Sequence, residues 1–237
     1  MKTTLLCTLL LLGAILTARA EQPLNQLTDA EKAAGWTLLF DGKDASTWWR
    51  GYKSDKLPEK WVVEEGALVR KGGGDIITRE QYESFDFSID WKISEGGNSG
   101  LMFKVLETDG APYVTGPEAQ IQDNVKGKDP EKAGWMYQLY PASVDTTKPA
   151  GEWNRFELKC HKTPAGTYRC EHWMNGAKYV EYEIGSEEWN AKVARSKFAK
   201  MPGFGKAAKG HLCLQDHGNE VAFRNIKIRV GPAPEKP

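Results

Sequence analysis

The chain has 237 residues with 32 basic and 32 acidic side chains, so its formal net charge is zero. This balance gives no electrostatic case for a protein that binds nucleic acid or anionic lipid. The length suits one large β domain or two small domains. Because the sequence contains no internal repeat, linker or low-complexity tract, we expect one domain.

The first 20 residues have the pattern of a secretory signal peptide. Lys2 gives a positive start, residues 5–16 form a short apolar run, and residues 18–20 (Ala-Arg-Ala) form a small-x-small cleavage site. The run is too short to span a bilayer comfortably, and no later segment is longer and equally apolar, so we expect no membrane insertion. We expect cleavage after Ala20 and export to the periplasm or the medium. Cleavage would remove Lys2 and Arg19, leaving 30 basic and 32 acidic residues.

Two helices are predicted in the rest of the chain. Thr28 and Glu31 have the spacing of a capping box, so we expect a short helix over residues 29–34. A longer helix is expected over residues 187–199, where Ser186 can cap the first turn and polar and apolar side chains are mixed.

Short strands account for most of the remaining chain. Alternating or apolar segments bounded by turn signals predict strands at residues 36–40, 61–63, 67–69, 85–93, 99–105, 118–122, 153–160, 168–174, 178–184, 211–215 and 221–230. This pattern favours an all-β fold, an antiparallel β-sandwich, and disfavours parallel α/β because strands do not alternate with helices. The expected organisation is a signal peptide (1–20), an extension with a short helix (21–34), a β-sandwich (35–230) and a disordered proline-rich tail (231–237).

Three cysteines remain after the predicted cleavage, namely Cys160, Cys170 and Cys213. Cys160 and Cys170 flank a sequence typical of a hairpin tip. Residues opposite each other on paired strands can lie about 5.5 Å apart at Cα, within reach of a disulfide, and an oxidising compartment would allow that bond. Cys213 would then stay free, or pair in place of one of the others. Metal binding by these cysteines is not indicated, because the tight Cys-x-x-Cys spacing is missing.

The strongest candidate site lies within residues 116–124. Because side chains alternate along a strand, Glu118, Gln120 and Gln122 should share one face of the predicted strand. A carboxylate and two amides on one face can hold hydroxyls, coordinate a cation or position a base. The alternative is a solvent-facing strand without a functional role.

A second candidate lies at residues 210–218. Where a solvated strand usually carries Lys, Glu or Thr, this segment carries Gln215 and His217, which suits a sheet that faces a ligand. The alternative is a strand end that turns into a polar loop at Gly218.

Other candidates are weaker. His172 alternates with Trp173, so one of them faces the core, and a single histidine is more often structural than catalytic. The loop at residues 96–100, which contains Asn98, could approach a ligand closely because its glycines remove steric hindrance, or could simply connect two strands. Most of the nine tryptophans should fill the core, whereas Trp48 and Trp135 lie beside loops and are better placed to stack on a sugar ring.

No Gly-x-Ser-x-Gly or His-Glu-x-x-His motif occurs, and neither does the Glu-x-Asp-x-x-Glu pattern of retaining β-glucanases. The sequence instead resembles the 3-keto-disaccharide hydrolase domain family over about residues 35–230. The matching segments are residues 35–43, 98–100, 116–123, 151–154, 171–176, 196–198 and 210–229. Lys104 stands where this resemblance leads us to expect arginine.

The resemblance implies a concanavalin A-like jelly-roll sandwich and an exported enzyme that cleaves 3-keto-glycosides. A carbonyl at C3 acidifies the proton at C2, so the oxygen on C1 can leave by elimination, and water then adds. Such a site needs a base, a group that polarises the ketone, and an acid for the leaving oxygen. It does not need the paired carboxylates of an ordinary glycosidase.

On this basis we expect three catalytic residues, five substrate-binding residues and a possible divalent metal ion. The catalytic set is Glu118, His172 and His217; the substrate-binding set is Asn98, Lys104, Gln120, Trp135 and Gln215; and the metal ligands are Asp123 with Glu118 or His217. The expected partners are an oxidised 3-keto sugar and, functionally, a sugar 3-dehydrogenase. The alternatives are a non-catalytic carbohydrate-binding module and an interaction domain of the same fold.

Overall fold

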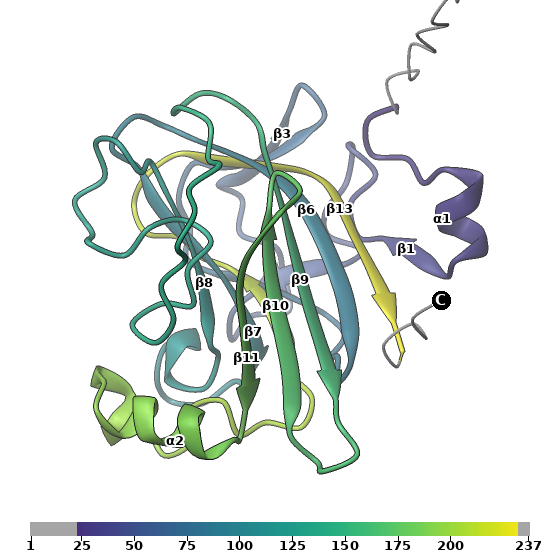
Figure 1. Ribbon diagram of the computed structural model, residues 1–237. Coiled ribbons are helices and arrows are strands. Elements are labelled where there is room, and N and C mark those ends of the chain that lie inside the picture. Colours follow the sequence, from purple (N-terminus) through teal and green to yellow (C-terminus); the bar gives the residue numbers. More distant parts are fainter. Residues whose placement is uncertain (1–22, 232–237) are drawn as a thin grey trace, which may run out of the picture.

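Two antiparallel β-sheets form the body of the protein (Figure 1). The structure is a computed structural model that describes residues 23–231, so the predicted signal peptide and nearly all of the predicted tail lie outside the described residues. The first sheet has the strand order β11-β10-β9-β6-β13-β4-β3, and β1 also pairs with β13. Its strands are β1 (Trp36–Leu38), β3 (Trp61–Glu64), β4 (Ala67–Arg70), β6 (Phe85–Ile93), β9 (Asn154–Lys162), β10 (Tyr168–Met174), β11 (Ala177–Ile184) and β13 (Val221–Val230).

The second sheet has five strands in the order β2-β5-β12-β7-β8. These strands are β2 (Trp49–Gly51), β5 (Ile76–Thr78), β7 (Asn98–Val105), β8 (Glu118–Gln122) and β12 (His211–Leu214). The expected all-β, jelly-roll sandwich is therefore confirmed. β2 and β5 were not predicted, because each has only three residues and neither shows alternation long enough to be recognised.

The main hydrophobic core lies between the two sheets. Trp91 and Phe87 from β6 and Phe103 from β7 are each no more than 1% exposed and belong to the same cluster. Phe87 and Trp91 are an even number of residues apart and so share one face of β6, as the alternation of the sequence predicts. On β8, Ala119 and Ile121 join this core, so the other face of β8 turns away from it.

The hairpin between β10 and β11 has the turn that its sequence predicts. Asn175 and Gly176 both have positive φ, at 50° and 84°. Two consecutive positive φ values are the requirement of a type I′ turn, which Asn-Gly satisfies at low steric cost.

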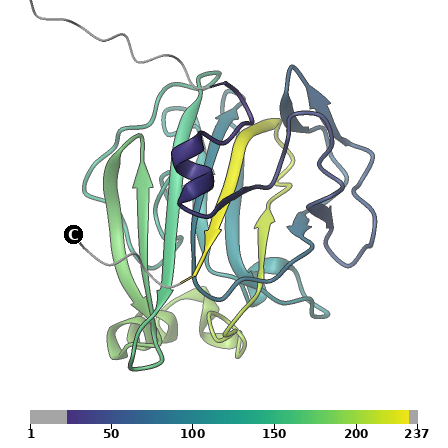
Figure 2. The same ribbon diagram turned by 90° about the vertical axis from the view of Figure 1, so that its right-hand side faces the viewer.

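The segment before the sandwich is attached to it rather than separate. α1 (Asp29–Ala33) has the predicted capping box between Thr28 and Glu31 and lies against the outer face of the eight-stranded sheet beside β13 (Figure 2). Asn25 and Asn225 each donate a main-chain N–H to the other's side-chain oxygen, at 2.7 and 2.8 Å. The predicted extension therefore contributes its own hydrogen bonds to the sheet.

The predicted long helix is divided into two. α2 (Glu187–Ala194) is capped by Ser186 as expected, but it ends before Ser196, which begins the 3₁₀ helix η2 (Lys197–Lys200). Ser196 Oγ accepts a hydrogen bond from the Phe198 N–H, which satisfies a main-chain donor at the start of the new turn. Among the described residues, no helix is long and apolar enough to cross a membrane.

Cys160 and Cys170 lie opposite each other on β9 and β10, as the hairpin pattern predicts. Their sulfur atoms are 3.2 Å apart, and the structure holds both residues as buried thiols, so the expected disulfide is not formed in it. Cys213 is likewise a buried thiol.

Candidate active site

A cavity of about 240 Å³ lies over β7 and β8, on the face of the five-stranded sheet that turns away from the core. Polar and aromatic side chains from six separate segments surround it. They are Asn98, Tyr113, Glu118, Gln120, Asp129, Tyr137, Lys197, Gln215 and His217. Five of the eight residues predicted to act in catalysis or substrate binding therefore line one cavity, namely Asn98, Glu118, Gln120, Gln215 and His217. Their individual roles stay predictions.

Glu118 is the buried carboxyl group of this cavity, with only 6% of the residue exposed. It lies against Gly100 of the neighbouring strand, where an added Cβ would collide with the carboxyl group of Glu118. Gly100 thus provides the space that Glu118 occupies. Among the described residues, the Glu118 carboxyl group makes no hydrogen bond, which leaves it available to a ligand.

The surroundings of Glu118 favour its protonated form. Burial raises the pKa of Glu118 to about 8, against a small opposing effect from the positive charge of Lys197. The negative charges of Asp129 and Asp75 raise the pKa slightly further. A carboxyl group with a pKa near neutrality is suited to accept and return a proton during a reaction.

Gln120 is 1% exposed, and both polar atoms of its side chain are buried without a hydrogen-bond partner among the described residues. Gln215 Oε1 is likewise buried without a hydrogen-bond partner among the described residues. Buried amide groups in folded proteins nearly always have partners, so unpaired amides that line a cavity indicate a site for a polar ligand. The burial of Glu118 and Gln120 also overturns the alternative of a solvent-facing strand.

The outer edge of β8 is paired with residues 134–137. The N–H of Gln120 donates to the carbonyl of Trp135 at 3.1 Å, and the N–H of Tyr137 donates to the carbonyl of Glu118 at 2.9 Å. This pairing places the Tyr137 ring beside the cavity. Trp135 takes part in the same pairing through its main chain, but its side chain does not line the cavity as predicted.

His172 lies outside the cavity, on the core side of the segment that pairs with β8. Its Nδ1 is 2.9 Å from the carbonyl of Gly134, and its Nε2 is 2.8 Å from the hydroxyl of Tyr182. Since a carbonyl can only accept, Nδ1 carries the proton and Nε2 accepts from the tyrosine. Burial lowers the pKa of His172 to about 4, so the ring is neutral. The geometry gives His172 a structural role and does not support the predicted catalytic one.

Lys104 also lies away from the cavity. Its φ of 54° marks a β-bulge in β7, where the register against β12 shifts. The side chain is fully buried and donates to the carbonyls of Ala207 and Ala208, with its ammonium 3.2 Å from the centroid of the Tyr168 ring. The substrate contact that the family resemblance implied is therefore not supported, because the ammonium group is buried against Ala207, Ala208 and Tyr168 instead.

The predicted metal set does not converge. Asp123 accepts hydrogen bonds from the N–H groups of Gly96 and Val125, one on each carboxylate oxygen, at 2.9 Å in both cases. These bonds hold two loops together, and Asp123 does not line the cavity with Glu118 and His217. No group of three or more His, Cys, Asp or Glu side chains in residues 23–231 is arranged to hold a metal ion.

Residues 35–229 match the family model of the 3-keto-alpha-glucoside-1,2-lyase-like domain. The chain belongs to this family. A 3-keto-disaccharide hydrolase from Bacteroides thetaiotaomicron is 33% identical over 235 residues, covering 84% of this chain and 79% of the relative.

Solved structures agree with this assignment. A candidate glycosyl hydrolase from Parabacteroides distasonis is 36% identical, with 88% of this chain and 100% of that chain covered and a TM-score of 0.79. A second candidate glycosyl hydrolase from the same organism is 27% identical, with 77% and 99% covered and a TM-score of 0.57. The relatives place the chain in a family of carbohydrate hydrolases.

Sequence reasoning missed four residues that line the cavity in this family member, namely Tyr113, Asp129, Tyr137 and Lys197. They lie on η1 (Pro112–Val114), on the irregular segment after β8, and on η2. Periodicity is uninformative in such segments. The sequence pointed to only one of these four residues: Lys197 lies in residues 196–198, one of the segments that carry the family resemblance.

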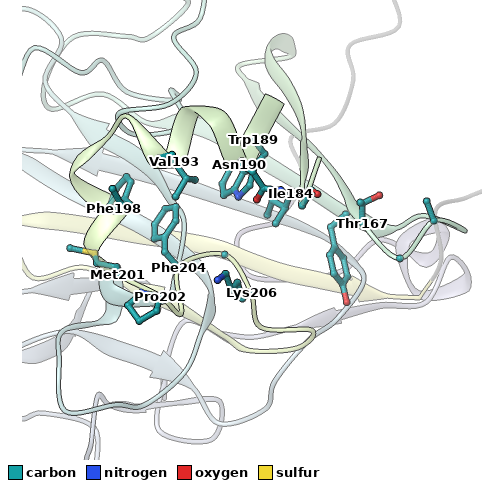
Figure 3. A pocket seen from close by; sticks show the side chains of 17 residues that line it. Thr167, Ile184, Trp189, Asn190, Val193, Phe198, Met201, Pro202, Phe204 and Lys206 are labelled. Carbon is teal, nitrogen blue, oxygen red and sulfur yellow. Dashed lines mark hydrogen bonds between the residues drawn. The ribbon is translucent and has the colours of Figure 1, made fainter. Parts of the chain in front are cut away.

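A second cavity of about 480 Å³ lies beside α2 and η2 (Figure 3). Trp189, Phe198 and Phe204 contribute to its wall, but each is no more than 2% exposed, so their ring faces are occupied by one another. Phe198 and Phe204 stack with their centroids 3.9 Å apart. This packing fixes η2 between the two cavities, with Lys197 at the first cavity and Phe198 at the second.

Proposed function

We propose that the protein cleaves the glycosidic bond of 3-keto-glycosides or 3-keto-disaccharides by elimination followed by hydration. The observation that carries this proposal is the buried carboxyl group of Glu118, which has no hydrogen-bond partner among residues 23–231 and shares its cavity with amide atoms that are likewise unpaired there. The family of the chain and the name of its Bacteroides relative support the choice of substrate.

In the proposed reaction, ionised Glu118 takes the proton from C2 of the keto sugar. The electrons of the C2–H bond form an enolate, and its collapse to the ketone expels the oxygen on C1 with formation of a C1=C2 bond. The leaving oxygen receives a proton, and water then adds across the double bond. Gln120, Gln215 and Asn98 hold the sugar hydroxyls, and His217, exposed at the mouth of the cavity, is the candidate acid for the leaving oxygen.

The decisive experiment compares a 3-keto-glucoside with the same glucoside before oxidation. We expect cleavage of the keto form only, because the unoxidised sugar lacks the carbonyl that acidifies C2. Equal cleavage of both would indicate an ordinary glycosidase and overturn the proposal. Binding of sugar without cleavage would instead favour a carbohydrate-binding module. Repeating the assay with a chelator tests the predicted metal ion.

The proposed substrate also implies where it comes from. A 3-keto sugar is formed by oxidation of a secondary hydroxyl, so a sugar 3-dehydrogenase must act before this protein.

We further propose that the protein is exported, since its first 20 residues have the features of a signal peptide. Mass spectrometry of the protein from its native host should find Glu21 as the first residue. A chain that keeps Met1 in the cytoplasmic fraction would contradict export.

A further inference from the structure

We propose that Lys197 is a catalytic residue whose ammonium group binds the C3 ketone oxygen of the substrate and stabilises the enolate. This inference rests on the proposed function, because that reaction places a negative charge on the ketone oxygen when Glu118 removes the C2 proton. Among the nine described residues that line the cavity, Lys197 provides the only ammonium or guanidinium group. Nothing in the sequence analysis assigned it a role.

The position of Lys197 is fixed by its two neighbours. On one side, Ser196 caps η2 through the Phe198 N–H and donates its own hydroxyl to the carbonyl of Val193 at 2.9 Å. On the other side, Phe198 is 1% exposed and stacks on Phe204 (Figure 3). Lys197 lies between these anchors, so the main chain that carries it is held at the cavity although its own side chain is exposed.

The charge of Lys197 is not neutralised by the protein. No ion pair or hydrogen bond of its ammonium group occurs among the described residues. The group lies 4.2 Å from the centroid of the Tyr137 ring and 5.8 Å from that of Tyr113. Aromatic faces attract a cation without supplying a compensating negative charge. The ammonium group is therefore oriented and still able to donate a hydrogen bond to an anionic oxygen.

The nearby carboxylate of Asp129 is already engaged. Its two oxygens accept hydrogen bonds from the Tyr137 hydroxyl at 2.8 Å and from the Glu131 N–H at 2.9 Å. Tyr137 contacts both groups, with its ring beside the Lys197 ammonium group and its hydroxyl bound to Asp129. The arrangement leaves the Lys197 ammonium group and the Glu118 carboxyl group without a hydrogen-bond or ion-pair partner among the described residues, as an enolate-binding cation and a base require.

The proposed step is balanced in atoms and electrons. The C2 proton moves to the Glu118 carboxylate, and the C2–H electrons form a C2=C3 bond. The carbonyl π electrons move to the ketone oxygen, whose negative charge is stabilised by a hydrogen bond from the Lys197 ammonium group. Reformation of the carbonyl then shifts the double bond to C1=C2 and breaks the C1–O bond. Because Lys197 acts before this bond breaks, its loss should slow proton removal itself.

Proton removal can be measured apart from cleavage. In D₂O, 3-keto-1,5-anhydroglucitol, which carries no aglycone at C1, should exchange its C2 proton for deuterium, and NMR follows the loss of the signal. We expect Lys197→Met to slow this exchange and the cleavage of a 3-keto-glucoside by a similar factor, roughly 10²-fold. Lys197→Arg should restore much of both rates. Lys200→Met, on the same 3₁₀ helix but outside the cavity, should behave as the wild type.

The outcomes separate the two proposals. If the wild type cleaves the keto substrate but Lys197→Met exchanges the C2 proton at the wild-type rate, the role of Lys197 is wrong and the proposed function stands. Slower cleavage with unchanged exchange would assign Lys197 to the leaving group and also overturn the inference. If the wild type neither exchanges nor cleaves, the proposed function fails and this inference fails with it. Thermal melting of each variant checks that it is folded.

Discussion

Glu118→Gln should lower the cleavage of a 3-keto-glucoside by roughly 10²–10⁴-fold, the usual contribution of a general base. Glutamine has nearly the same shape as glutamate but cannot accept the C2 proton. The sugar contacts of Gln120 and Gln215 remain, so the effect should appear in kcat more than in KM. Steady-state kinetics of purified wild type and variant, with the same keto substrate, would measure it.

A matched control is Glu131→Gln. Glu131 is also partly buried, and burial also raises its pKa, but it does not line the cavity. We expect this variant to cleave at nearly the wild-type rate. The pH profile gives a second check, because the base acts only when ionised: wild-type kcat/KM should rise with pH until about the pKa of 8. Near-normal turnover by Glu118→Gln would exclude Glu118 as the base.

The same substitution should make the protein more stable near neutral pH. Below pH 4.5 the folded and unfolded states both hold the Glu118 proton, so this group has no effect on stability. Between pH 4.5 and about 8 the unfolded chain releases the proton while the folded protein keeps it, which favours unfolding as the pH rises. At pH 7 the loss is about 3 kcal/mol, and Glu118→Gln removes it.

Denaturant unfolding at several pH values would test this expectation. The free energy of unfolding of Glu118→Gln should exceed that of the wild type by an amount that grows from pH 4.5 to pH 8. Because the buried glutamine also lacks a partner, a constant offset between the two proteins is expected, and the change with pH is the informative quantity. A difference that does not vary with pH would show that Glu118 titrates normally. The expected growth of this difference with pH would show that the buried carboxyl group of Glu118 lowers the free energy of unfolding of the wild type.

The architecture could be predicted because it follows from local rules. Alternation predicted the long strands, and the type I′ turn at Asn175 and Gly176 requires the residues present there. The shared face of Glu118 and Gln120 also follows from a period of two. Each of these inferences depends on residues only a few positions apart.

The rest of the site depends on contacts between distant segments, which no local rule supplies. The bulge at Lys104 turns one side chain away from the cavity, and the apolar run of residues 101–103 before it does not mark its position. The alternation of His172 with Trp173 is visible in the sequence, but the partner of the His172 ring, the carbonyl of Gly134, lies 38 residues away. Lys197 reaches the cavity only because Phe198 is packed against a later loop.

The pairing of residues 134–137 with β8 has a consequence for solubility. β8 is the last strand of its sheet, and a strand edge with free N–H and C=O groups can pair with another molecule. The segment that brings Tyr137 to the cavity also covers this edge, through hydrogen bonds from Tyr137 and Gly134 and to Trp135. A change that loosened this segment would expose the edge to aggregation as well as disturb the cavity.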